Sequence, residues 1–210
     1  MANPSLVAFG SLAPWSSPAE FDNLHSSFVQ HEELEPLREA YSQLPKLWKI
    51  LCDKDKTLGS VDGNSAAEQL TQWLLTGQAP SRSFARNNIL SLPLTITSHI
   101  CEYISHHKYI GNKNYESAAV QGFCAGQLSA GAIDNATSLE DVAKRAVTSM
   151  YMAFAIGAQI DKDALENGQT NCLAIRCKAP NKLDTVRMWL GAYEEVSQQL
   201  FEQYIASPPY

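Results

Sequence analysis

The sequence has few of the features that would direct a protein to a membrane or to nucleic acid. No apolar run approaches the ~20 residues that a membrane-spanning helix needs, and Met1-Ala2-Asn3-Pro4 lacks the basic start and apolar stretch of a secretory signal. Lysine and arginine form no cluster, and the formal net charge of −6 disfavours a nucleic-acid-binding groove. We therefore expect a cytoplasmic protein that binds neither membranes nor nucleic acid.

Cysteine is scarce, and its spacing excludes common metal sites. The five cysteines include no Cys-x-x-Cys pair, so we expect free thiols in a reducing compartment and no bound metal. Cys101 falls on an apolar helical stripe, whereas Cys172 and Cys177 fall in a strand-like run. These three cysteines are therefore expected in the core. The chain also lacks internal repeats and low-complexity tracts.

Length and apolar periodicity predict a single α/β domain, 1–210. A chain of 210 residues, 45% hydrophobic and 18% charged, can bury a substantial core. The apolar run 5–10 ends in glycine and predicts a buried parallel strand. Apolar residues at three- and four-residue intervals predict helices over 18–29, over 32–53 with a break at Pro45, over 66–75, and over 90–108 with Pro93 near its start.

The second half of the chain also alternates between helix and strand patterns. Ser138, with an acid three residues later, predicts the start of a helix whose core face includes Met150 and Met152. A charged linker is expected over 161–169, followed by a strand over 172–177 and an amphipathic helix over 185–204.

The stretch that organises the chain is Gly122-Phe123-Cys124-Ala125-Gly126, which follows small apolar residues and precedes a helical pattern. A nucleophile at a sharp strand-to-helix turn needs glycine on both sides, because a β-carbon there would clash. The Cys124 sulfur would project over a helix N-terminus, which lowers a thiol pKa and can stabilise an oxyanion. A buried structural thiol, where a strand packs tightly on a helix, is an equally good interpretation of the motif alone.

His99 lies in the buried-looking part of the helix that precedes this turn. A core histidine bonded to a backbone carbonyl is the simpler interpretation of such a position, and a catalytic histidine is the alternative.

Four stretches, in the same order, resemble the starter-unit acyl-carrier-protein transacylase domain of fungal non-reducing polyketide synthases. They are Leu6-Val7-Ala8-Phe9-Gly10, Leu92-Pro93-Leu94-Thr95-Ile96, Gly122-Phe123-Cys124-Ala125-Gly126 and Met152-Ala153-Phe154-Ala155-Ile156-Gly157. The resemblance implies the malonyl-CoA:acyl-carrier-protein transacylase fold, here a reduced acyltransferase-like core with a short, mainly parallel sheet flanked by many helices. Its most specific part is the cysteine, because most relatives of that fold have serine there.

The resemblance also implies covalent acyl transfer from a thioester to the phosphopantetheine of an acyl carrier protein, with no cofactor beyond that carrier arm. Cys124 would be the nucleophile and the Ala125 amide an oxyanion donor, and Gln127, Gly10 and Ser11 would border the same site.

Three features of the family are missing from this sequence. The loop after the first strand reads Gly10-Ser11-Leu12 where the family has a glutamine, and Ala155 stands where an arginine is typical. The family's catalytic histidine lies beyond the last residue, as do the ferredoxin-like subdomain and the C-terminal catalytic part. A missing subdomain would expose apolar surface, which makes a homodimer plausible.

These departures leave three functional hypotheses. The leading one is a stand-alone enzyme that releases a carrier-bound polyketide chain as an α-pyrone, with His99 as the base, because an enolised β-ketoacyl chain supplies its own nucleophile. The second is starter-unit loading through Cys124, and the third is a non-catalytic docking partner of a synthase.

Overall fold

The structure, a computed structural model, describes residues 5–10, 17–81, 87–110 and 117–167. All of them belong to one unit, Met1–Thr170. The predicted strand over 172–177, the predicted helix over 185–204, and the residues Ser11, Cys172 and Cys177 lie outside the described residues.

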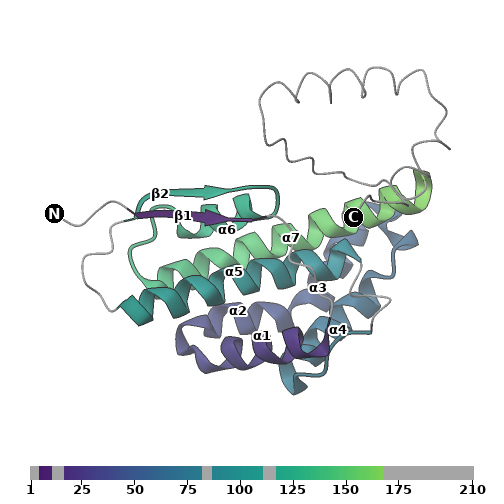
Figure 1. Cartoon of the computed structure of the whole chain (residues 1–210). Coiled ribbons are helices and arrows are strands. Elements are labelled where there is room, and N and C mark those ends of the chain that lie inside the picture. Colours follow the sequence, from purple (N-terminus) through teal and green to yellow (C-terminus); the bar gives the residue numbers. More distant parts are fainter. Residues whose placement is uncertain (1–4, 11–16, 82–86, 111–116, 168–210) are drawn as a thin grey trace, which may run out of the picture. The chain divides into compact units, whose positions relative to one another are not determined.

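Helices dominate this unit, and a two-stranded sheet lies on one side of them (Figure 1). These helices and the parallel strand pair confirm the α/β class predicted from the sequence, with helix in clear excess. None of the described helices carries an apolar stretch long enough to cross a bilayer. In chain order the elements are β1 (Ser5–Phe9), α1 (Pro18–Gln30), η1 (Glu32–Leu34), α2 (Glu35–Ser42), α3 (Leu44–Lys54), η2 (Lys56–Ser60), α4 (Gly63–Thr76), α5 (Asn88–Ile110), β2 (Ser117–Gly122), α6 (Gly126–Ile133) and α7 (Leu139–Asn167).

The two strands pair in parallel, so their carboxyl ends meet at one edge of the sheet. Leu6 is opposite Ala119, and Phe9 is opposite Gly122. The Phe123 amide extends the pairing by donating to the Phe9 carbonyl over 3.0 Å. In parallel α/β sheets this edge is where ligands bind. The Cys124 turn follows β2 at this edge.

Two helix boundaries follow from local chemistry. The predicted break at Pro45 is confirmed: α2 ends at Ser42, and Pro45 lies in the first turn of α3, where its missing N–H is not needed. Helix α4 begins at Gly63, earlier than the predicted Ala66. The Asp62 side chain caps it there by accepting a hydrogen bond from the Ser65 amide over 3.3 Å.

Helix α7 overturns two expectations from the sequence. Residues 161–167, predicted as linker, are helical, and Asp161 accepts hydrogen bonds from the Asn88 and Ile89 amides at 3.0 and 2.9 Å. Its carboxylate therefore caps the N-terminus of α5 from a distant part of the chain. Met150 is buried as predicted, but Met152 is 49% exposed because it lies about 200° further round the helix.

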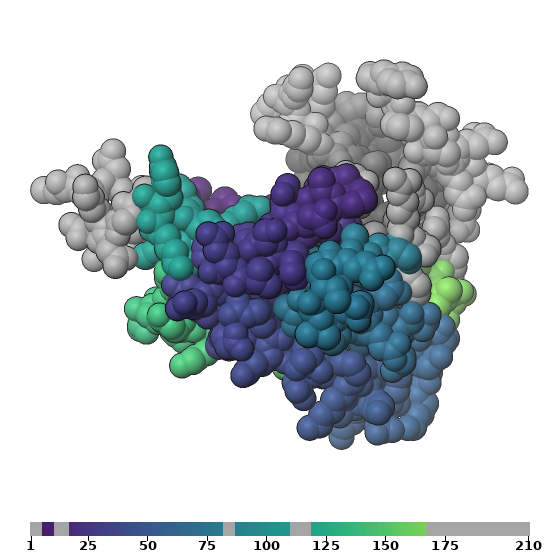
Figure 2. Space-filling view, turned by 90° about the horizontal axis from the view of Figure 1, so that it is seen from below, coloured from purple at the N-terminus to yellow at the C-terminus, as the bar shows by residue number. Residues whose placement is uncertain are grey.

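An aromatic cluster joins the N-terminal helices to α5. Phe28, Tyr41 and Trp73 are fully buried, and the rings of Phe28 and Trp73 are stacked with centroids 5.9 Å apart. The Tyr41 hydroxyl forms a hydrogen bond with the Thr97 hydroxyl on α5 at 2.6 Å. Each such ring contributes on the order of 2 kcal/mol through burial. Helices α1 to α4 cover α5 and α7 on the side away from the sheet, and their side chains form the face in Figure 2.

His31 is a buried histidine between η1 and α5. Its Nε2 is 2.8 Å from the Ser105 hydroxyl, and its Nδ1 is 3.4 Å from the Lys108 ammonium, which also pairs with Glu33 at 2.8 Å. An ammonium only donates, so Nδ1 accepts, and the Nε2–H group donates to Ser105. Burial lowers the His31 pKa, the Lys108 charge lowers it further, and the Glu33 charge opposes both.

We expect the protonation of His31 to lower the free energy of unfolding as the pH falls. Its pKa is lower in the folded protein than the ordinary value of 6.5, so the unfolded chain binds the proton first. The stabilisation is therefore present above about pH 6.5 and is lost as the pH falls towards and through the folded-state pKa. Urea unfolding at pH 7.5 and 5.5 should show a smaller drop in the free energy of unfolding for His31→Gln than for the wild type. Equal drops in the two proteins would contradict this assignment.

Candidate active site

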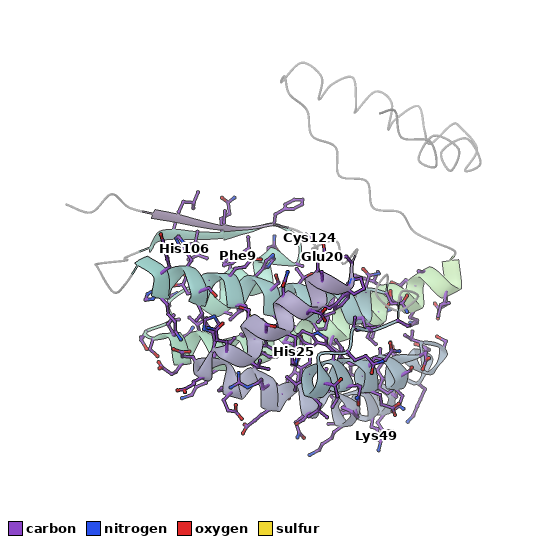
Figure 3. All side chains as sticks on the ribbon, turned by 60° about the horizontal axis from the view of Figure 1, so that its bottom comes forward. Phe9, Glu20, His25, Lys49, His106 and Cys124 are labelled. Carbon is purple, nitrogen blue, oxygen red and sulfur yellow. The ribbon has the colours of Figure 1, made fainter. Side chains whose placement is uncertain are left out.

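The turn after β2 holds Cys124 in a conformation that few non-glycine residues adopt. Cys124 has φ of 54°, in the left-handed region, and its side chain is exposed. Figure 3 shows it at the end of the sheet, on the side of the unit opposite Lys49. A left-handed non-glycine residue costs on the order of 1 kcal/mol or more, and such residues cluster at functional sites. The strand, sharp turn and helix predicted from the sequence are therefore confirmed.

Two glycines make this turn possible. A β-carbon on Gly122 would collide with the carbonyl of Gly126 at the start of α6. A β-carbon on Gly126 would collide with the Gly10 carbonyl and would lie 2.5 Å from the Phe9 carbonyl oxygen. Any side chain at either position would therefore push apart the ends of β1 and β2 and the start of α6.

Helix α6 begins two residues after Cys124, so the first amides of this helix follow the turn directly. The Gly126 and Gln127 amides each donate over 3.0 Å, to the carbonyls of Phe123 and Cys124. The amide of Ala125, a residue that is itself buried, donates to no backbone carbonyl among the described residues. Its role as an oxyanion donor stays a prediction, and an amide without a backbone acceptor is what that role requires.

Cys124 differs from the other described cysteines in its exposure. Burial raises the pKa of Cys101 to about 12 and also raises the pKa of Cys52, which disfavours the thiolate form of both. Cys101 is a core residue, as predicted. Within the described part of the chain all three cysteines are free thiols, and the Cys124 sulfur makes no hydrogen bond to any described residue.

His99 on α5 contacts α6, the helix that follows the turn, and β1, the strand that pairs with β2. Its Nδ1 is 2.9 Å from the Ser129 hydroxyl on α6, and its ring centroid is 5.2 Å from that of Phe9 on β1. Burial lowers the His99 pKa, and the nearby Glu102 carboxylate opposes this. The interpretation of His99 as a carbonyl-bonded core histidine is wrong, because its partner is a hydroxyl. That arrangement belongs to His25, which donates to the Leu74 carbonyl over 2.9 Å.

The other predicted site residues lie at the same edge where they are described. Gly10 follows β1 and is exposed, and Gln127 is exposed in the first turn of α6. Ala155, in place of an arginine, lies in α7 and is partly buried. The described residues contain no group of three or more histidine, cysteine, aspartate or glutamate side chains that could hold a metal ion.

Ser129 is a site-adjacent residue that sequence reasoning missed. It is fully buried one turn after Ala125, on the side of α6 that faces α5. A polar residue on the buried side of a short helix is a weak signal, and its partner His99 is far away in sequence.

Comparison with known proteins identifies relatives over nearly the whole chain. Residues 56–207 match the family "Starter unit:ACP transacylase in aflatoxin biosynthesis". The chain is 34% identical to methylphloroacetophenone synthase of Cladonia uncialis over 93% of its own length and 8% of that protein. It is 29% identical to 5-methylorsellinic acid synthase of Aspergillus terreus, over 98% of its own length and 8% of that protein. For a non-reducing polyketide synthase of Gibberella zeae the identity is 28%, over 98% and 10%. The chain thus spans a tenth or less of these relatives.

We predict opposite effects for two glycine substitutions within α6. Gly126→Ala should destabilise the protein by about 3 kcal/mol, because its β-carbon meets two backbone carbonyls that cannot rotate away. Gly131→Ala should stabilise it by about 0.5–1 kcal/mol, because a β-carbon there meets nothing within 4 Å and alanine favours helix.

Urea unfolding of both variants and the wild type tests this pair of predictions. Alkylation of Cys124 by iodoacetamide, followed by mass spectrometry, reports whether the turn itself has changed. A Gly126→Ala protein as stable as the wild type would show that the close backbone contact does not exist.

Proposed function

This chain belongs to the starter unit:ACP transacylase family, and from that premise we propose that it is an acyltransferase-type enzyme of polyketide biosynthesis that carries an acyl group on Cys124. One observation carries the proposal: an exposed thiol held in the left-handed region between a strand and a helix N-terminus. This arrangement exposes a nucleophile next to the Ala125 amide, which donates to no backbone carbonyl among the described residues and is a candidate oxyanion donor.

The proposed reaction has two thioester exchanges. The Cys124 thiolate attacks the carbonyl carbon of an acyl thioester, the new S–C bond forms, and the donor's C–S bond breaks. The donor thiolate leaves and takes up one proton. This balances the proton that the Cys124 thiol lost when it became a thiolate. The thiol of a carrier protein's phosphopantetheine then attacks the acyl-cysteine in the same way and regenerates Cys124. During each exchange the negative charge develops on the carbonyl oxygen, which the Ala125 amide would hold.

Acylation of Cys124 is the first test. After incubation with a short acyl-CoA, intact-protein mass spectrometry should show one acyl adduct. Cys124→Ala should reduce the amount of adduct about 1000-fold or to nothing, because the exposed nucleophile is gone. Cys52→Ala is the matched control and should keep the adduct, because Cys124 is intact and partial burial raises the pKa of the Cys52 thiol. An unmodified wild-type protein, or an adduct that persists in Cys124→Ala, would contradict the proposal.

A second candidate function is release of a carrier-bound β-ketoacyl chain as an α-pyrone. What supports it is that the Cys124 sulfur has no hydrogen-bond partner among the described residues, so they supply no base for the thiol. In this reaction the enol oxygen of the substrate attacks its own thioester carbonyl and expels the carrier thiol. The protein needs only to orient the chain and bind the oxyanion.

The pyrone hypothesis predicts faster lactone formation from a carrier-loaded β-ketoacyl chain in the presence of the protein than in buffer, measured by chromatography. Cys124→Ala should keep most of that acceleration, because the thiol is not the nucleophile in this reaction. Equal rates with protein and with buffer would exclude release. A purely docking role is the third hypothesis. It predicts that folded Cys124→Ala and His99→Ala variants both keep their effect on polyketide formation, while neither acyl transfer nor lactone formation by the protein is detected.

A further inference from the structure

Ser129 and His99 form an isolated hydrogen-bonded pair beside the Cys124 turn. Ser129 is fully buried in α6, and its Oγ is 2.9 Å from the Nδ1 of His99 in α5. The imidazole ring also contacts the Phe9 ring at the end of β1. Through this pair and the Phe9 contact, α5 is connected both to α6, the helix that follows the turn, and to β1.

The Ser129 hydroxyl has no other hydrogen-bond partner among the described residues, which decides the direction of the bond. Other helical hydroxyls in this protein donate to a carbonyl: Thr71 to Ala67, Thr95 to Ser91 and Thr97 to Pro93. Ser129 makes no such bond to the carbonyl four residues before it. A buried hydroxyl hydrogen left unpaired is costly, so the Ser129 hydroxyl donates its hydrogen bond to Nδ1 of His99.

We propose that Ser129 is a positioning residue that donates to Nδ1 of His99 and so fixes the ring as the Nε2–H tautomer. A neutral imidazole carries one proton, so an Nδ1 that accepts a hydrogen bond leaves the proton on Nε2. The opposite arrangement, with Nδ1–H donating to Ser129, would leave the hydroxyl hydrogen unpaired in the core. His99 is then a hydrogen-bond donor, and it has no free lone pair with which to remove a proton.

This assignment gives His99 a different role from the base expected from the sequence. Burial lowers the His99 pKa, so the ring is neutral near neutral pH. Its Nε2 has no hydrogen-bond partner among the described residues. Under the proposed acyl transfer, on which this role rests, an Nε2–H group beside the turn can stabilise a carbonyl oxygen or an anion. The tautomer itself does not depend on that function.

The nitrogen chemical shifts of the histidine rings test the tautomer directly. In a long-range ¹H–¹⁵N correlation spectrum of the full chain at pH 7.5, His99 should show a protonated-type shift at Nε2 and an unprotonated-type shift at Nδ1. His25 provides an internal reference, because its Nε2 lies 2.9 Å from the Leu74 carbonyl and must donate. An unprotonated-type shift at Nε2 of His99 in the wild type would overturn the proposal.

Two substitutions separate positioning from simple packing. Ser129→Ala removes the donor, so the two His99 nitrogens should move towards averaged shifts, with at least a tenfold change in the ratio of tautomers. Ser129→Thr keeps the hydroxyl and should restore the wild-type pattern. Unchanged His25 shifts in both variants show that the fold is retained. A Ser129→Ala spectrum identical to that of the wild type at His99 would overturn the positioning role. Because no acyl donor is present, a failure of the proposed function would leave these results unaffected.

Discussion

The exposed thiol depends on the close approach of three pieces of backbone: the end of β1, the end of β2 and the start of α6. Only residues without a β-carbon can occupy positions 122 and 126, since the carbonyls of Gly126, Phe9 and Gly10 fill the space that a side chain would need. This contact leaves the chain three residues, 123–125, in which to turn from strand to helix, and Cys124 takes the left-handed conformation. The free energy that offsets this strained residue comes from burial elsewhere, above all in the packing of α7 on α5 and α6.

Polar groups inside the helical layer hold these elements in register. Asp161 of α7 accepts hydrogen bonds from the first amides of α5 and so fixes the N-terminus of α5 against α7. Close packing at Gly157 against Asn88 brings the two helices near enough for this cap to form. At the other end of α5, His31, Lys108 and Glu33 connect the helix to η1. Helix α5 is thus anchored at both ends, and His99 projects from its middle towards the turn.

What could be predicted from the sequence is what depends on near neighbours in the chain. The break at Pro45 and the turn at Cys124 were predicted because proline and glycine act within a few residues. The continuation of α7 past Asp161 was not, because its stabilising partners are the amides of Asn88 and Ile89. The pairing of Ser129 with His99 was not predicted either, because the two residues are 30 positions apart in the sequence. Met152 was misplaced because two methionines two residues apart lie on opposite faces of a helix.

The parallel pairing of β1 with β2 has a consequence for how the protein is made on the ribosome. Strand β1 is synthesised before helices α1 to α5, whereas its partner β2 is synthesised only after them. Until β2 has been synthesised, both edges of β1 are unpaired, which favours association with other chains. The turn that bears Cys124 can therefore form only after α1 to α5 have been synthesised, and a growing chain has no strand-paired thiol site before that point.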